Sequence, residues 1–377
     1  MRFSTRFHWD LRPNRLTQAL AARRAAGAAV LDLTESNPTR AGLAYPPEIQ
    51  CAFDDPRTLV YEPSPAGAAE AREAVAAYYA ARGHRVPPSR ILLTASTSEA
   101  YSYLFKLLCD PGDEVLVPRP SYPLFEFLAD MESVKVRQYP LVYHGLWSME
   151  SPQFTERTRA MVLVNPNNPT GSYVKRAELA ALVERCAARG VALISDEVFA
   201  DYWFAADPER ETSLVDVEAC AAFCMSGLSK VAGLPQMKLG WIVGNREAAM
   251  ERLEWIADTY LSVSTPVQCA ARRLLEQGDR VQRQIRERTA ANLTVAREVL
   301  AGSSASILTV EGGWYVTLQA PCVRTEEEWV LELLEREGVL LQPGFFFDFE
   351  AEAFLVASLL TEPATFREGL SRVRQWL

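Results

Sequence analysis

The stretch AMVLVNPNNPTG, residues 160–171, joins a buried-strand pattern to a rigid polar turn. Its first five residues are continuously apolar, which is typical of a strand covered on both faces in a parallel sheet. Two prolines and a glycine then fix an irregular turn whose amides point outward. A purely structural turn needs only one or two such residues, so this density favours a binding role.

Expected helices and strands alternate through the middle of the chain. Alanine-rich, helix-forming stretches are expected at 68–82 and 176–189, closed by Gly83 and Gly190, and a longer amphipathic helix at 281–301. Short apolar runs lie between such stretches, at 91–93, 114–117, 160–164, 191–194, 221–225 and 239–243. Alternating helices and strands predict an α/β architecture with a mainly parallel sheet flanked by helices.

The order of expected strands and helices changes late in the chain. Strands are expected at 307–310, 315–319 and 354–360, around a helix at 325–337. This pattern predicts a smaller α+β domain that the N-terminal segment joins. We therefore expect a large domain formed by residues 45–270, and a small domain formed by residues 1–44 and 271–377.

Composition narrows the class of protein. The chain has 377 residues, which at about 150 residues per domain corresponds to two or three domains. Its net charge of -9 argues against a protein that binds nucleic acid or an anionic membrane through an overall positive charge. It does not exclude a small anionic ligand. The seven Cys and three scattered His disfavour a metal site. The charged N-terminus is unlike a signal peptide, and no apolar run approaches ~18 residues, so we expect a cytoplasmic enzyme.

Polar residues follow several of the expected strands, at the sheet edge where open parallel sheets bind ligands. Ser96 and Thr97 begin a helix after the first strand, where they can hold an anion or act simply as caps. Tyr122 lies in the turn RPSYP, where its ring can stack on a flat ligand or pack on the core.

Two ionisable residues also follow apolar runs. Asp196 comes directly after VALIS, and a carboxylate there needs a cation, a hydrogen-bond donor or a capping role. Lys230 ends the segment SGLSK, where a partly buried amine would have a lowered pKa and could form a Schiff base. The commoner fate of a lysine is a solvated surface position.

The order and spacing of these segments resemble the fold-type I pyridoxal-phosphate enzymes of the class I/II aminotransferase, or aspartate aminotransferase, superfamily. The resemblance covers nearly the whole chain, and NPNNPTG and SGLSK are its most specific parts. It implies that Lys230 is the Schiff-base lysine and moves the proton at the substrate α-carbon. It also implies that Asp196 pairs with the pyridinium nitrogen, Asn168 bonds the phenolic oxygen and Tyr122 stacks on the ring.

The resemblance further implies where the phosphate and substrate bind. The phosphate would be held by Ser96, Thr97, Ser229 and Lys238. Tyr61, in YEPSPAG, resembles the tyrosine that reaches the neighbouring subunit's phosphate, which implies a homodimer with shared active sites. Asn37, in ESNPT, falls where the family's N-terminal loop meets the substrate.

The sequence departs from the family at three positions. Lys238 replaces an arginine, which keeps the charge but loses the bidentate fork, and Phe199 replaces a tyrosine that bonds the phenolic oxygen. In FLVASLL, Val356 stands where many members carry the arginine that clamps the substrate α-carboxylate. Either another cation binds this carboxylate, Arg40 being the first candidate, or the substrate lacks one.

We therefore expect a pyridoxal-phosphate aminotransferase that moves an amino group between an amino acid or amine and a 2-oxo acid. Two alternatives remain open at this point. One is a lyase or decarboxylase using the same cofactor, because the bond cleaved depends on the orientation of the substrate. The other is a non-catalytic cofactor-binding protein, which an intact Lys230 and Asp196 disfavour.

Overall fold

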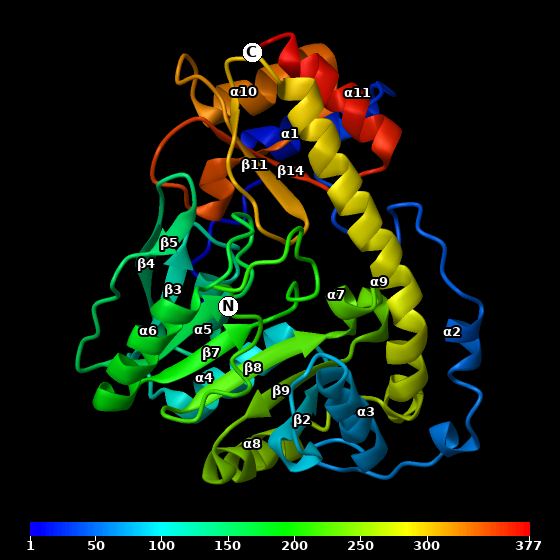
Figure 1. Ribbon diagram of the computed structural model, residues 1–377, viewed down its shortest axis with the longest axis vertical. Coiled ribbons are helices and arrows are strands. Elements are labelled where there is room, and N and C mark those ends of the chain that lie inside the picture. The colour runs from blue at the N-terminus through cyan, green and yellow to red at the C-terminus, as the bar shows by residue number, and fades with distance from the viewer.

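The computed structural model describes residues 1–377, and its centre is an eight-stranded sheet (Figure 1). The strand order is β2-β9-β8-β7-β6-β3-β4-β5. Strands β3, β4, β6, β7 and β8 are parallel, whereas β9 is antiparallel to both its neighbours and β5 to β4. The strands are β2 (Ile91–Thr94), β3 (Glu114–Arg119), β4 (Lys135–Tyr143), β5 (Trp147–Met149), β6 (Thr158–Val164), β7 (Ala192–Asp196), β8 (Ala222–Gly227) and β9 (Gly240–Gly244).

Helices cover both faces of this sheet because its central strands are apolar on both sides. In β6, Met161 and Leu163 pack into the core beneath α3 and α6, while Val162 and Val164 pack into the core beneath α4, α5 and α8. The helices of this part are α2 (Glu48–Cys51), α3 (Ala69–Ala80), α4 (Thr97–Leu108), α5 (Phe125–Met131), α6 (Arg176–Arg189), α7 (Leu228–Val231) and α8 (Glu247–Tyr260). The predicted mainly parallel sheet flanked by helices is confirmed.

A second, antiparallel sheet has the order β10-β11-β14-β13 and its own core. Its strands are β10 (Ser306–Ile307), β11 (Tyr315–Gln319), β13 (Gln342–Pro343) and β14 (Phe354–Ser358). Helices α1 (Arg15–Ala25), α10 (Glu326–Glu332) and α11 (Pro363–Arg374) pack around it, and a π-helical turn at Leu333–Glu337 extends α10. Strand β1 (Leu31–Asp32) pairs with β12 (Val339–Leu340), which attaches the N-terminal segment to this part.

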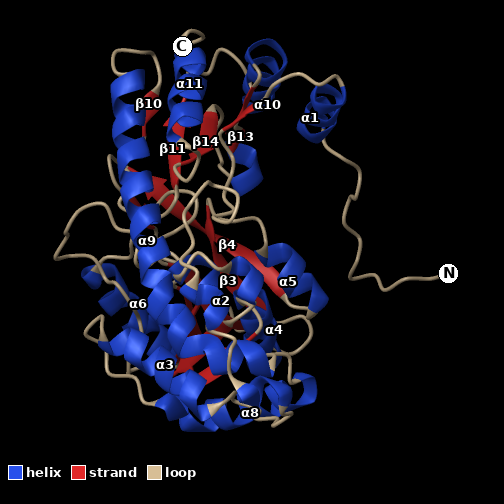
Figure 2. Ribbon diagram, turned by 90° about the vertical axis from the view of Figure 1, so that its right-hand side faces the viewer, coloured by secondary structure: helices blue, strands red, loops and turns tan.

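Helix α9 (Thr265–Leu300) runs alongside both sheets, from α3 to α11 (Figures 1 and 2). It starts well before the expected residue 281 and crosses the predicted domain boundary at residue 270 without a break, so that boundary stays a prediction. The strand expected at 307–310 is also shorter, ending at Ile307.

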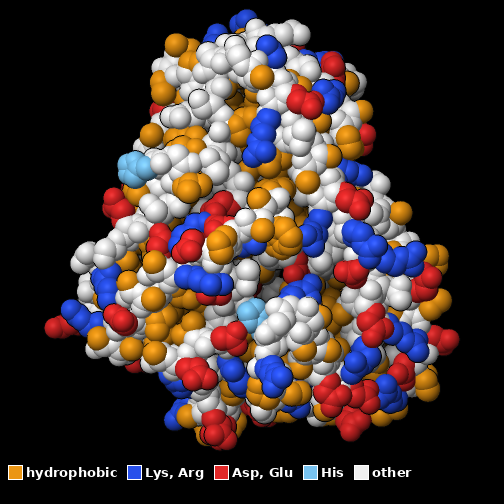
Figure 3. All heavy atoms as spheres, viewed as in Figure 1, with side chains coloured by type: hydrophobic (Ala, Val, Ile, Leu, Met, Phe, Trp, Pro, Cys, Tyr) orange, Lys and Arg blue, Asp and Glu red, His pale blue; other side chains and the backbone are white.

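No helix of the structure is both long and apolar enough to cross a membrane. Acidic and basic side chains are interspersed over the face in Figure 3, without a large field of one sign.

Two glycines let three elements meet closely at the edge of the large sheet. A Cβ on Gly240 would lie 3.1 Å from the backbone of Ser96 and 3.2 Å from the carbonyl oxygen of Ser226. A Cβ on Gly227 would lie 2.9 Å from the carbonyl oxygen of Leu239. A side chain at Gly240 would push β9 away from the start of α4 and from β8, and one at Gly227 would push β8 away from β9.

We expect Gly240→Ala to lower the free energy of unfolding by about 1–3 kcal/mol, because backbone atoms rather than flexible side chains must move. It should also weaken binding of any ligand held jointly by α4 and β9. Gly145→Ala is the control for ligand binding: its positive φ makes the substitution costly for stability as well, but open space surrounds Gly145 and no element at the sheet edge has to move. Denaturant unfolding and ligand titration measure the two effects, and equal ligand affinity in both variants would contradict this account.

Candidate active site

Lys230 lies on α7, directly after the carboxyl end of β8, with its amine against aromatic rings. Its Nζ is 4.6 Å from the centre of the Trp314 ring and 5.5 Å from that of Phe199. Burial lowers the pKa of Lys230 from 10.5 to about 8, and the negative charge of Asp196 partly opposes this shift. An amine in this environment is far more often uncharged, and therefore nucleophilic, than a solvated lysine.

Asp196 ends β7, the strand parallel to and beside β8. Its carboxylate accepts hydrogen bonds from the Tyr101 hydroxyl at 3.0 Å and from the Val198 N–H at 3.2 Å. Burial raises the pKa of Asp196 to about 6, although both hydrogen bonds favour the ionised form. Tyr101, on the inner face of α4, was not identified from the sequence, because it reads there as one more core aromatic.

The turn after β6 contains three asparagines, and the structure gives them different tasks. Asn165 accepts from the Val174 N–H and donates to the Glu211 carbonyl, so it holds its own turn together. Asn167 donates to the Pro120 carbonyl and accepts from the Ser121 hydroxyl. Only Asn168 has a buried side-chain oxygen without a partner. It is therefore the asparagine of this turn available to a ligand.

Tyr122 lies on a turn that joins the two parts of the molecule. The preceding residue, Ser121, bonds Asn167 through its hydroxyl and donates its N–H to the Phe347 carbonyl at 2.9 Å. The Tyr122 ring itself remains 47% exposed. A firmly held backbone with an exposed ring suits stacking on a flat ligand.

The start of α4 presents free backbone donors. Ser96 is its N-cap and accepts from the Glu99 N–H at 3.2 Å. The N–H groups of Thr97 and Ser98 donate no hydrogen bond within the chain. Together with the helix dipole they suit a phosphate. Ser98 was not proposed from the sequence, although its place one residue into the helix could have indicated it.

Ser229 and Lys238 lie on the two segments that follow β8 and precede β9, which are joined by the hydrogen bond from the Leu228 N–H to the Leu239 carbonyl at 2.9 Å. Ser229 is half-buried on α7, beside Lys230. Lys238 immediately precedes the Leu239–Gly240 segment, is exposed and has φ 51°, a left-handed backbone. The structure therefore brings the residues expected to bind phosphate to one edge of the large sheet.

Comparison with known proteins agrees with this arrangement. The family model "Aminotransferase class I and II" matches residues 29–373. The chain belongs to the class I and II aminotransferases. It is a pyridoxal-phosphate-dependent aminotransferase, as the sequence indicated.

Named relatives cover the chain to different extents. The probable N-acetyl-LL-diaminopimelate aminotransferase of Bacillus subtilis (strain 168) is 25% identical over 85% of this chain and 82% of its own. The glutamate-pyruvate aminotransferase AlaA of Escherichia coli (strain K12) is 30% identical over 65% of this chain and 63% of its own. A Thermus thermophilus aspartate aminotransferase single mutant has the same fold, with TM-score 0.86, 24% identity and full coverage of both chains.

The side chains of this aminotransferase fit pyridoxal phosphate. The Lys230 amine makes no hydrogen bond within the chain, and Asp196 offers a carboxylate on the neighbouring strand. The side-chain amide of Asn168, which makes no hydrogen bond within the chain, can donate its N–H to the phenolic oxygen, and the free backbone N–H groups of α4 face the phosphate. Phe199, which replaces the family's tyrosine, is buried and offers no hydroxyl, so the phenolic oxygen would rely on Asn168.

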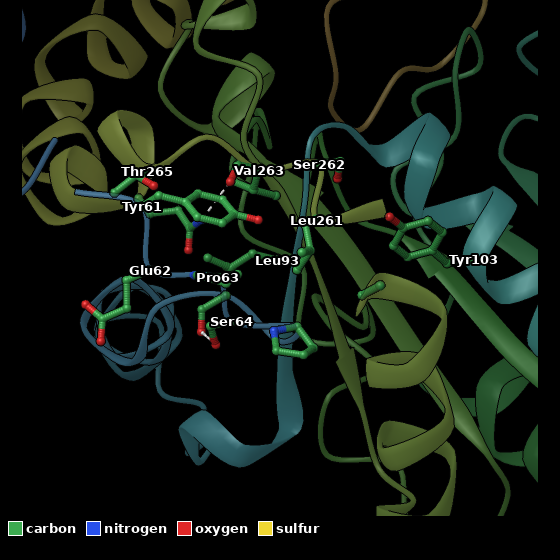
Figure 4. A pocket seen from close by; sticks show the side chains of 14 residues that line it. Tyr61, Glu62, Pro63, Ser64, Leu93, Tyr103, Leu261, Ser262, Val263 and Thr265 are labelled. Atoms are coloured by element: carbon green, nitrogen blue, oxygen red, sulfur yellow. Dashed lines mark hydrogen bonds between the residues drawn. The ribbon is translucent and has the colours of Figure 1, made fainter. Parts of the chain in front are cut away.

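Tyr61 lies at a separate, shallow surface hollow, lined also by Ser64, Ser262, Thr265 and Gln268 (Figure 4). The Tyr61 side chain is 77% exposed. Lys230 and Asp196 do not line this hollow. A single chain therefore leaves Tyr61 apart from the residues around Lys230.

The N-terminal loop carrying Asn37 and Arg40 is attached to β14. The Ser358 hydroxyl donates to the Glu35 carbonyl at 2.6 Å, while the Asn37 side chain accepts from Thr39. Arg40 is exposed and its guanidinium forms no hydrogen bond or ion pair. Val356, on β14, is fully buried.

We expect the Lys230 amine of the cofactor-free enzyme to react with an acylating reagent with a midpoint near pH 8. Asp196→Asn should lower this midpoint, because it removes the negative charge that favours the ammonium form. Mass spectrometry of the Lys230 peptide after brief labelling at graded pH measures both values. An upward shift in the variant would contradict the assigned electrostatics.

Proposed function

We propose that this aminotransferase exchanges amino groups by a ping-pong reaction between an amino acid or amine and a 2-oxo acid, with Lys230 as its catalytic residue. The observation that carries this proposal is the Lys230 amine, which is half-buried, makes no hydrogen bond and lies at the end of the strand next to the one that ends in Asp196. When bound, pyridoxal phosphate supplies an aldehyde carbon for the amino group and a protonated ring that takes up electron density. Pyruvate is the acceptor to test first, since one relative is a glutamate-pyruvate aminotransferase.

Lys230 is suited to both binding and proton transfer. With a pKa of about 8, roughly a quarter of its amine is uncharged at pH 7.5, against roughly one part in a thousand at the ordinary value of 10.5. A base whose pKa lies near the working pH both takes up and returns a proton readily. In this role the Nζ atom carries the proton to and from the substrate α-carbon.

Asp196 and the surrounding polar groups hold the ring in place. Above its pKa of about 6 the Asp196 carboxylate is mostly ionised, so it can keep a proton on a ring nitrogen. Asn168 would bond the phenolic oxygen and Tyr122 would stack on the ring. Ser96, Thr97, Ser229 and Lys238 would hold the phosphate, against which Lys238 provides the positive charge.

We also propose a homodimer with shared active sites and a cytoplasmic location. The exposed Tyr61 ring supports the first, because a large exposed aromatic side chain is suited to a partner surface. The second is supported by seven free cysteines, which are typical of a reducing compartment.

Lys230→Ala should lower turnover by at least about 10³-fold, because it removes the proton-transferring base. It should also abolish the visible absorbance of lysine-bound cofactor. Lys106→Ala is the control, since Lys106 pairs with Glu132 on the surface. Steady-state kinetics and absorbance spectra measure these effects, and full turnover in the Lys230 variant would refute the proposed mechanism.

A mixture of Lys230→Ala and Tyr61→Ala chains tests the shared site. If Tyr61 acts across the interface, a mixed dimer contains one complete site, with Lys230 from one chain and Tyr61 from the other. Mixing the two impaired variants after reversible dissociation should then restore up to about a quarter of wild-type activity, because half the dimers are mixed and each has one site. An absence of recovery, with mixed dimers verified by differential tagging, would contradict this role of Tyr61.

A further inference from the structure

Lys230 is carried by a very short helix. Helix α7 has four residues, Leu228–Val231, which is about one turn, so the carbonyl groups at its end lack partners inside the helix. The Lys230 carbonyl accepts a long backbone bond from the Gly233 N–H, at 3.4 Å, and no backbone N–H donates to the Val231 carbonyl. A helix this short does not fix its own end, so neighbouring elements have to hold it.

Two buried side chains donate hydrogen bonds to these carbonyl groups. The hydroxyl of Tyr202, which follows β7, donates to the Lys230 carbonyl. The side-chain amide of Gln282, on α9, donates to the Val231 carbonyl at 2.7 Å. The two peptide groups that follow the Lys230 α-carbon are therefore held from outside α7.

Gln282 is itself held by a fixed carboxylate. Its amide also donates to Asp201, at 2.8 Å. Because a carboxylate and a carbonyl both only accept, the NH₂ group of Gln282 has to face them. Asp201 is fixed in turn from α3, where Arg82 donates two hydrogen bonds to it at 2.6 and 2.8 Å and the Tyr78 hydroxyl donates one at 3.0 Å. Gln282 therefore joins α3, α7 and α9 at one point.

Helix α9 also lies close against the segment that follows Lys230 (Figure 1). A Cβ on Gly278 would lie 2.3 Å from that of Ala232. A Cβ on Gly233 would lie 2.8 Å from the side chain of Val281. The end of α7 therefore has little room to shift while it stays bonded to α9.

Tyr202 also contacts the aromatic side chain that faces the Lys230 amine. Its ring centre is 5.2 Å from that of Trp314, in an edge-to-face arrangement, and the Lys230 Nζ is 4.6 Å from the centre of the Trp314 ring. One residue thus fixes the lysine backbone and packs against the ring beside the amine. A shift of this backbone away from Trp314 would expose the amine to water, and burial is the main cause of its lowered pKa.

Helix α9 contains a second buried amide with the same pattern of hydrogen bonds. Asn292 is fully buried, and its side-chain amide donates to the carbonyl groups of Leu359 and Thr361 at 2.9 and 2.8 Å. These carbonyl groups follow β14 in the small sheet, and Asn292 lies about 15 Å along the helix from Gln282. The two amides make equivalent bonds from one helix, but only Gln282 reaches the segment that carries Lys230.

We propose that Gln282 and Tyr202 are positioning residues for Lys230. By holding the end of α7, they keep the amine against Trp314 and Phe199, where it takes up and returns the substrate α-proton. This inference rests on the proposed role of Lys230 in the aminotransferase reaction. Neither side chain bonds the amine, so both act through the backbone of Lys230.

The first experiment measures the protonation of Lys230 in the cofactor-free enzyme, by acylation at graded pH and mass spectrometry. Gln282→Met keeps the length of the side chain and removes both hydrogen-bond donations. We expect the labelling midpoint to rise from near pH 8 by about 0.5–1 unit, because the released amine is less buried. Asp196, the charge that acts on this amine, is unchanged in the variant. An unchanged or lower midpoint in the folded variant would overturn the inference.

Asn292→Leu is the matched control, because it removes two equivalent hydrogen bonds from the same helix. Denaturant unfolding should show comparable losses of stability in the Gln282 and Asn292 variants. The labelling midpoint should stay unchanged in Asn292→Leu. An equal rise of the midpoint in both variants would show a general loosening of α9 and would overturn the inference.

Tyr202→Phe provides a milder variant that keeps the ring and removes only the hydroxyl. It should raise the labelling midpoint in the same direction as Gln282→Met, by a smaller amount. Tyr173→Phe is its control, because the buried Tyr173 hydroxyl donates to the Ala200 carbonyl, outside α7. A midpoint in Tyr202→Phe no higher than in Tyr173→Phe would overturn the inference even if Gln282→Met does not fold.

Kinetics of the holoenzyme with L-glutamate and pyruvate provide a separate readout. Gln282→Met should lower kcat by about tenfold and change KM by less than about twofold, because the proton-transferring amine is displaced while the substrate-binding groups remain. A raised KM at unchanged kcat would overturn the inference. If the wild-type holoenzyme turns over no amino donor with any 2-oxo acid, the proposed function fails, and the labelling midpoints still decide whether Gln282 and Tyr202 position Lys230.

Discussion

The burial of one lysine amine is the constraint around which this structure is organised. A charged ammonium beside the rings of Trp314 and Phe199 has lost much of its hydration, and Asp196 restores only part of that free energy. The amine consequently loses its proton near pH 8. This balance exists only if β7 and β8 end side by side, so that the carboxylate is near enough to moderate the shift but does not form an ion pair.

The rest of the large sheet supplies the backbone for that arrangement. Gly227 lets β8 approach β9, and Gly240 lets β9 approach the start of α4, where free N–H groups are available to an anion. Asn167 and Ser121 fix the turn after β6 to the turn that carries Tyr122, and Phe347 extends this attachment to the small sheet. The polar side chains that hold these turns are therefore distinct from those left for a ligand.

Much of this arrangement could be predicted from the sequence, because its central strands are continuously apolar and its ligand-facing residues directly follow them. Strand β4 was missed because KVRQYPLVY is only partly buried and includes charged residues and a proline, so it lacks that signature. Trp314 was missed because its contact with Lys230 depends on tertiary structure. The three asparagines of NPNNPTG were separable only by the resemblance to a family, and the structure shows the physical difference in their hydrogen bonds. The shared role of Tyr61 needs two chains and stays a prediction.

The two sheets make different demands on a substrate. The large sheet holds the amine, the carboxylate and the helix start proposed to bind phosphate, so it determines which reaction can occur. The small sheet presents Thr317, Val356 and Gln342, none of which is charged. Val356, where many members of the family carry an arginine, is fully buried in the core that also contains Phe199 and Trp314. Because the small sheet offers no cation at this position, any cation that binds a substrate carboxylate has to come from another element.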